Sequence, residues 1–86
     1  MLKNSVRDPA GALAYITDCT LATVSNLAGK KSAPKYELRR QITIAQQAID
    51  WLRLYDVDFS KTRAQEVVDD HGGSVEAWAL TFSAEG

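Results

Sequence analysis

Residues 36–55 carry apolar side chains on two adjacent faces of one expected helix. At about 100° per residue, the apolar positions of this segment fall into two rows rather than one. The first row consists of Leu38, Ile42, Ala45, Ile49 and Leu52. The second row consists of Ile44, Ala48, Trp51 and Tyr55. A helix that covers a core from one side needs one row, so this pattern predicts the central helix of a small bundle or one wall of a subunit interface.

A first helix is predicted over residues 9–28, because Asp8 suits the N-cap, Pro9 suits the first helical position and Gly29 suits the position after the last. Its apolar residues form a single row, which is typical of a helix at the surface of a bundle. The row consists of Leu13, Ile16, Thr20, Val24 and Leu27, with Leu21 and Ala28 at its flank. The connection to the long helix reads GKKSAP over residues 29–34, and Ser32 is expected to cap that helix.

Two short helices are predicted in the last third of the chain. Ser60 or Thr62 can cap a helix over about residues 63–70, which Gly72 and Gly73 would end. Ser74 can cap a final helix. The inward positions of the two helices are Ala64, Val67 and Val68, and then Val75, Trp78, Ala79 and Phe82. Phe59 precedes both helices as an isolated apolar residue that should anchor the connecting segment in the core.

The absence of strand signals completes the fold prediction. No segment alternates apolar and polar residues as a half-buried strand does, and no Asn-Gly or Asp-Gly turn occurs. We therefore predict an all-α fold: a small helical bundle of two long antiparallel helices plus a short C-terminal helix hairpin. One helical domain should span residues 1–86, with residues 1–8 and 83–86 frayed.

Charge is distributed unevenly along the chain. Residues 1–40 carry seven Lys or Arg side chains against three carboxylates, and residues 41–86 carry three against eight. Such a division is typical of a basic surface that meets an acidic partner, or of two halves that attract each other. The single cysteine excludes an internal disulfide and suits a reducing compartment. No apolar run reaches the length of a membrane span, so a cytoplasmic protein without a membrane partner is expected.

Catalytic and metal-binding patterns are missing from the sequence. Cys19 and His71 are the only residues of their kinds, and nothing in their spacing predicts that they meet. No glycine-rich phosphate-binding motif occurs. A metal or catalytic centre at Asp69, Asp70 and His71 is the least supported alternative, because no spaced ligand accompanies it. We expect no enzyme activity, no cofactor, no metal ion and no small-molecule substrate.

A cluster of basic residues is the strongest charged feature. It consists of Lys30, Lys31, Lys35, Arg39 and Arg40. Glu37 is the one carboxylate within it. Cations at this density could contact a nucleic-acid backbone or an acidic protein. The overall pI of about 5.7 is low for a nucleic-acid-binding domain, so nucleic acid is the alternative rather than the leading partner.

Several apolar residues lie outside the predicted core rows. Tyr15, Tyr36 and Leu54 fall on polar sides of the long helices, and Leu80 falls outside the row of the last helix. Together with the second row of the long helix, these positions favour a protein–protein contact. The candidate partner surface consists of Tyr36, Trp51, Leu54, Tyr55 and Leu80. We expect a small non-catalytic interaction or regulatory protein acting through its helical surface as a homodimer or with another protein; the alternative is a nucleic-acid-binding accessory protein that uses the basic cluster.

Residues 57–82 show a local resemblance to a known protein-binding family. Phe59 and the run Gly73-Ser74-Val75-Glu76-Ala77 match the loop, turn and closing helix of ubiquitin-associated-type three-helix modules. Asp58 stands where those modules have a loop glycine, and Thr81-Phe82 stand where leucines are common. Both departures fall on the surface that binds partners in that family. The resemblance covers less than a third of the chain and implies a protein-binding module.

Overall fold

Four helices form the part of the chain that the structure, a computed structural model, describes, which is residues 9–83. Helix α2 spans Pro9–Ala28, α3 spans Lys35–Leu54, α4 spans Arg63–His71 and α5 spans Val75–Leu80. No strand occurs within residues 9–83. The predicted all-α bundle is therefore confirmed. Most of the ends where fraying is predicted, residues 1–8 and 84–86, lie outside the described residues.

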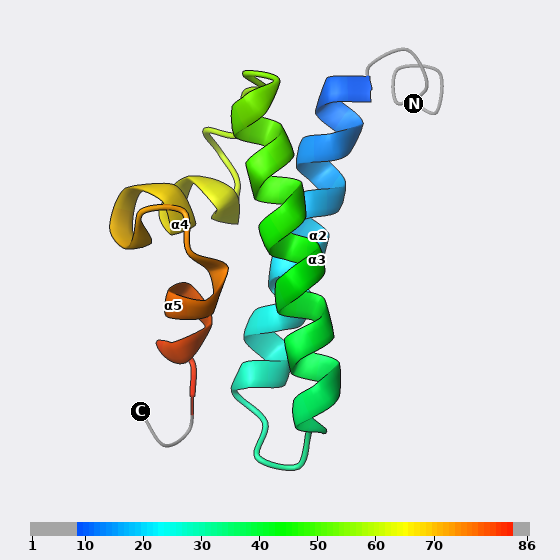
Figure 1. Cartoon of the computed structure of the whole chain (residues 1–86), viewed down its shortest axis with the longest axis vertical. Helices are drawn as coiled ribbons and strands as arrows, with labels where there is room; N and C mark the ends of the chain where they lie inside the picture. The colour runs from blue at the N-terminus through cyan, green and yellow to red at the C-terminus, as the bar shows by residue number, and fades with distance from the viewer. Residues whose placement is uncertain (1–8, 84–86) are drawn as a thin grey trace.

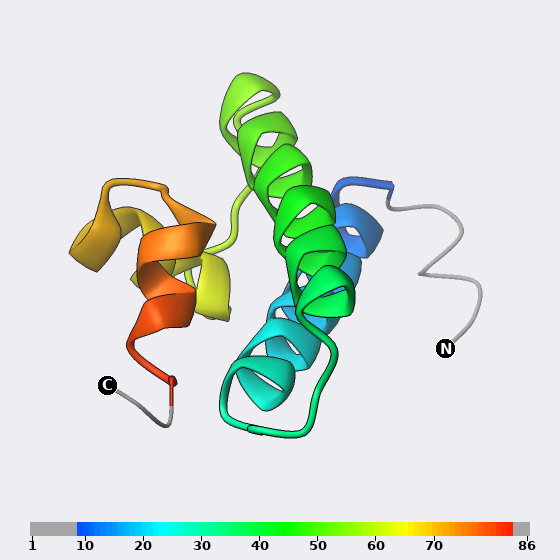
Figure 2. The same ribbon diagram turned by 60° about the horizontal axis from the view of Figure 1, so that its bottom comes forward.

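The helices are arranged as a long hairpin with a short hairpin on one side of it. Helices α2 and α3 run antiparallel and side by side over their whole lengths (Figures 1 and 2). Helices α4 and α5 both lie against one side of this pair. On the opposite side of the long hairpin, neither view shows another described helix. Within the described residues, one side of α2–α3 is thus packed and the other is left open.

The core lies where the two hairpins meet. Ala45, Ile49 and Leu52 of α3 are buried, and Leu38 and Ile42 pack against them, so the first apolar row of the long helix is confirmed. Across from this row, the buried residues of the short hairpin are Ala64, Val67, Val75, Trp78 and Ala79. Phe59 is partly buried and packs against the same core, as predicted. Burial of these side chains is the main source of stability in a chain of this size.

The predicted core row of α2 is wrong by part of a turn. The buried residues are Ala14, Thr17, Leu21 and Val24. Ile16, which the sequence assigned to the core, is 58% exposed. The reason is that α2 contacts α4 and α5 as well as α3, so its buried arc lies between these contacts. Thr17 tolerates burial because its hydroxyl donates a hydrogen bond of 2.6 Å to the Leu13 carbonyl.

Two of the three helix caps predicted within the described residues are present, and the predicted cap at Asp8 lies outside those residues. The Thr62 hydroxyl accepts from the Ala64 N–H at 3.2 Å, and the Ser74 hydroxyl accepts from the Ala77 N–H at 3.2 Å. The predicted cap at Ser32 is wrong. Pro34 occupies the N-cap position of α3 in an extended conformation, and no side chain caps this helix. Proline has no acceptor on its side chain, so the first N–H groups of α3 lack the partner that a Ser, Thr, Asp or Asn would supply.

Gln46 holds the short hairpin against α3. Its side-chain Nε2 donates to the Gly73 carbonyl at 2.8 Å, and its Oε1 accepts from the Val75 N–H at 2.9 Å. One amide therefore serves a donor and an acceptor on either side of Ser74, the N-cap of α5. These two bonds fix which side of α3 faces α5.

The turn between α4 and α5 depends on two glycines with left-handed backbones. Gly72 has φ +63° and open space around its Cα, whereas Gly73 has φ +90° and is buried. A Cβ at Gly73 would collide with the guanidinium of Arg53. Gly72→Ala should lower the free energy of unfolding by about 1 kcal/mol. Gly73→Ala should lower it by about 1–2 kcal/mol, because φ +90° is also a left-handed backbone, whereas the exposed Arg53 side chain can move aside at little cost. Urea unfolding measures both losses; unchanged stability in either variant would contradict the left-handed backbone at that glycine.

Candidate functional site

Two adjoining cavities lie at the end of the long hairpin where α2 ends and α3 begins. Their volumes are about 330 Å³ and about 250 Å³. Both are lined by Ala28, Lys35, Leu38 and Ser83, so they form one continuous depression. We call this depression the basic groove. It is built from the last turn of α2, the 29–34 connection, the first two turns of α3 and the end of α5.

The basic groove combines an apolar floor with a cationic rim. The apolar lining residues are Leu27, Ala28, Ala33, Leu38, Ile42, Ala79 and Leu80. The cationic ones are Lys30, Lys31, Lys35 and Arg39, and Glu76 is the one lining carboxylate. Within residues 9–83, none of the four cations forms an ion pair. The groove therefore offers apolar contact and uncompensated positive charge at one place.

Backbone turns of the connection hold the two lysines at the groove. The Lys30 N–H donates to the Leu27 carbonyl at 3.2 Å, and the Ala33 N–H donates to the Lys30 carbonyl at 3.3 Å. These bonds keep the connection folded over the end of α2 rather than extended. Lys30 and Lys31 also follow the carbonyl end of α2, where a positive charge is favourable.

The structure brings together most of the predicted basic cluster and separates one member from it. Lys30, Lys31, Lys35 and Arg39 line the groove, but Arg40 does not. The Arg40 guanidinium instead lies 4.0 Å from the Glu37 carboxylate, on a mostly exposed part of α3.

Leu80 belongs to the groove, although the sequence placed it with a separate apolar surface. It lies on α5, some forty positions along the chain from the cations. Its side chain lines the same cavity as Lys35 and Arg39. In the sequence, Leu80 stands out only because it falls outside the apolar row of the last helix. Its position in the groove follows from the packing of α5 beside α3.

A second surface lies on the open side of the long hairpin. Ile44 is 45% exposed and Trp51 is 46% exposed, and Tyr55 is also exposed. Along α3, these residues and Ala48 lie between about 140° and 200° from Gln46, which faces α5. They therefore point away from the short hairpin. The predicted second row of α3 is left uncovered by the described part of the chain.

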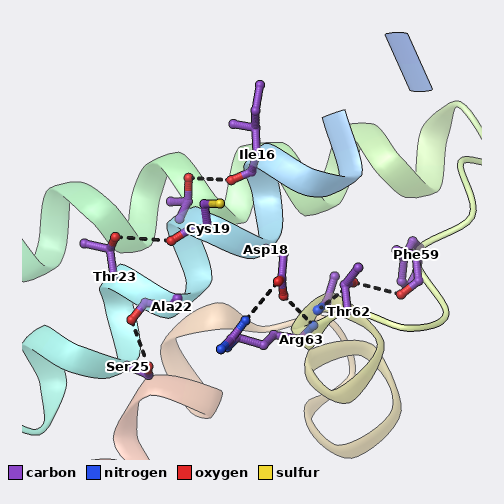
Figure 3. Close-up of polar contacts among 11 residues, drawn as sticks. Ile16, Asp18, Cys19, Ala22, Thr23, Ser25, Phe59, Thr62 and Arg63 are labelled. Carbon is purple, nitrogen blue, oxygen red and sulfur yellow. Dashed lines mark hydrogen bonds and ion pairs between the residues drawn. The ribbon is translucent and has the colours of Figure 1, made fainter. Parts of the chain in front are cut away.

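Ile16 extends this second surface onto α2. Asp18 marks the side of α2 that faces α4, because its carboxylate accepts from the Arg63 N–H at 2.8 Å and from the Arg63 guanidinium at 2.9 Å. Figure 3 shows Ile16 and Asp18 projecting from opposite sides of α2. Since α2 and α3 are antiparallel, the first half of α2 lies beside the second half of α3. We call Ile16, Ile44, Ala48, Trp51 and Tyr55 the hairpin face.

The other members of the predicted partner surface lie elsewhere. Tyr36 and Leu54 are both exposed, but they lie at opposite ends of α3, each about 60° around the helix from Trp51. Thus Trp51 and Tyr55 belong to the hairpin face, Leu80 belongs to the basic groove, and Tyr36 and Leu54 belong to neither.

Cys19 and His71, the candidate reactive residues, lie on different helices. Cys19 is exposed on α2, where its hydrogen bond with Tyr15 raises the pKa of the Tyr15 hydroxyl above its ordinary value. His71 ends α4, next to Asp69 and Asp70. In the described range, no three His, Cys, Asp or Glu side chains are grouped closely enough to hold a metal ion. No helix described there is both long and apolar enough to cross a membrane.

Comparisons with known proteins return no match for this chain. No protein-family model matches it, no curated protein matches it, and no solved structure matches it. The function is therefore argued from the two surfaces described above.

Proposed function

We propose that this chain is a small, non-catalytic protein-interaction module of the cytoplasm that forms a homodimer through the hairpin face. The observation that carries the proposal is the exposure of Ile16, Ile44 and Trp51 on the side of the long hairpin where no other described helix packs. Trp and large aliphatic side chains are the residues that interfaces bury at their centres.

The chemistry of the hairpin face favours a second copy as the occupant. In a two-fold symmetric contact the same patch meets itself, so a patch with charge of one sign would repel its partner. Positions 44, 48, 51 and 55 of α3 and the neighbouring Ile16, Thr20 and Thr23 of α2 are uncharged. The charged residues next along this side of α3, Glu37 and Arg40, have opposite signs and lie 4.0 Å apart. A surface without net charge and with a central Trp is suited to pairing with its own copy.

This dimer would leave the basic groove accessible in each copy. The groove is completed by α5, which lies on the packed side of the long hairpin, and the hairpin face is on the opposite side. Two copies joined through the hairpin face would therefore present two grooves to other molecules.

Ile44→Glu should convert the dimer to a monomer. Each dimer would bury two unpaired carboxylates, one on each copy, which should weaken association by at least about 100-fold. Sedimentation equilibrium would measure the change as a mass of 9.4 kDa in place of twice that value. Far-UV circular dichroism should be unchanged, because Ile44 is half-exposed within the described chain.

Leu80→Glu is the matched control, since Leu80 is also exposed, at 65%, but lies on α5 on the packed side of the long hairpin. This variant should keep the mass of the unsubstituted protein. The proposal fails if Ile44→Glu remains a dimer, or if Leu80→Glu disrupts association equally.

A further inference from the structure

We propose that the basic groove binds an acidic amphipathic helix of a partner protein. The site is separate from the hairpin face, and its occupant differs from the second copy proposed there. The inference rests on the general proposal of an interaction module but not on dimerisation.

The apolar floor indicates that the ligand carries apolar anchors. Leu38 and Ala28 lie at the centre of the depression, where both cavities share them, and Leu80 extends the floor onto α5. Two cavities side by side suit two anchor side chains on one face of a helix, spaced three or four residues apart. Burial of such anchors would supply most of the affinity.

The cationic rim indicates that carboxylates flank those anchors. Lys30 and Lys31 border one cavity, Arg39 borders the other, and Lys35 borders both. Within the described chain these four cations have no anionic partner, so they are free to pair with one. Charge complementarity of this kind speeds association and selects against basic partners.

The start of α3 adds to the positive potential of the groove. This twenty-residue helix begins at Lys35 without a side-chain cap, so its N-terminal N–H groups carry partial positive charge beside the same cations. Glu37 lies in the first turn but lines neither cavity.

A nucleic acid fits this site less well than a peptide does. A phosphate backbone would use the cations but would leave Leu38, Ile42 and Leu80 without apolar contact. Glu76 would also face the phosphates. An amphipathic peptide uses both parts of the groove.

Helix α4 of a second copy is also a poor occupant. The exposed carboxylates Asp69 and Asp70 lie on α4, together with Glu66. Of the apolar residues of that helix, Ala64 and Val67 are buried and Val68 is partly buried against its own core. Helix α4 therefore has acids but no free apolar face to place in the groove.

An NMR titration tests this inference: designed peptides are added to the full chain, which is labelled with ¹⁵N. The acidic peptides would be about four turns long. Each would carry Leu anchors at i and i+3 or at i and i+4, flanked by Glu. A basic peptide replaces every Glu by Lys, and a scrambled acidic peptide keeps the charge but breaks the apolar face. At least one acidic amphipathic peptide should shift the amide signals of residues 27–42 and 79–83, and the basic and scrambled peptides should not.

Charge and anchor variants identify the site. Leu80→Glu and Arg39→Glu should each weaken binding of the acidic peptide by about tenfold or more. Both side chains are exposed, so the fold should be retained. Leu54→Glu and Arg40→Glu are the matched controls, because they make the same changes on α3 outside the groove, and they should bind as the unsubstituted protein does.

Three outcomes would overturn the inference: no acidic peptide shifts the groove signals, the basic or scrambled peptide binds equally well, or a DNA duplex binds the groove more tightly than any peptide. Repeating the titration with Ile44→Glu separates the two proposals. Groove binding by a monomeric protein would stand even if the hairpin face were not a dimer interface.

Discussion

Trp78→Ala should lower the free energy of unfolding by about 3–5 kcal/mol, which is a large share of the total for a domain of this size. The Trp78 side chain is 1% exposed and is the largest fully buried one in the described chain. Its indole N–H donates to the Glu66 carboxylate at 3.2 Å, and its ring meets the Phe82 ring edge to face at 4.8 Å. Truncation would open a cavity between the two hairpins. Urea unfolding followed by circular dichroism would measure the loss.

Trp78→Phe is the control that separates packing from hydrogen bonding. It keeps an aromatic ring but removes the N–H that reaches Glu66. Because Glu66 is exposed and water can replace its lost partner, this variant should lose clearly less stability than Trp78→Ala. A loss below about 1 kcal/mol for Trp78→Ala would contradict the placement of Trp78 at the centre of the core.

Leu21→Ala should lower the free energy of unfolding by about 2–5 kcal/mol. Leu21 is fully buried on α2, whereas Ile16 is 58% exposed. Ile16→Ala should therefore lower the free energy of unfolding by less than about 1 kcal/mol. Both changes should be made in the Ile44→Glu protein, so that association does not contribute to the measured stability. Urea unfolding of the pair gives the comparison directly.

The order of these two losses also tests the orientation of α2. The spacing of its apolar residues, read alone, puts Ile16 in the core and Leu21 at the flank. If Ile16→Ala were the more damaging change, α2 would be rotated about its axis relative to the described structure.

The extent to which the fold followed from the sequence differs among the helices. For α4 and α5, caps and glycines mark both hairpin ends, and each helix has one buried face, so local patterns sufficed except at Phe82, which was predicted to point inward but lies beyond α5 and is 37% exposed. For α2, the residues are apolar or small around much of the circumference. Which of them are buried depends on where α4 and α5 dock, and that arrangement is not encoded in local spacing.

The candidate sites were predictable to different degrees for a similar reason. Four of the five clustered cations meet at one groove because they are close in sequence. Leu80 could not be assigned to them, because its position depends on long-range contacts such as those of Gln46 with Gly73 and Val75. On the hairpin face, the α3 residues were visible as a second apolar row. Ile16 was missed because it had been assigned to the core.

Light scattering coupled to gel filtration, on the unsubstituted chain at low and at moderate salt, tests the central proposal most directly. Contact through an uncharged face should be nearly independent of ionic strength. The expected result is a mass of twice 9.4 kDa at both salt concentrations. A mass of 9.4 kDa at every protein concentration, or a dimer that dissociates when salt is added, would contradict the hairpin face as the subunit interface.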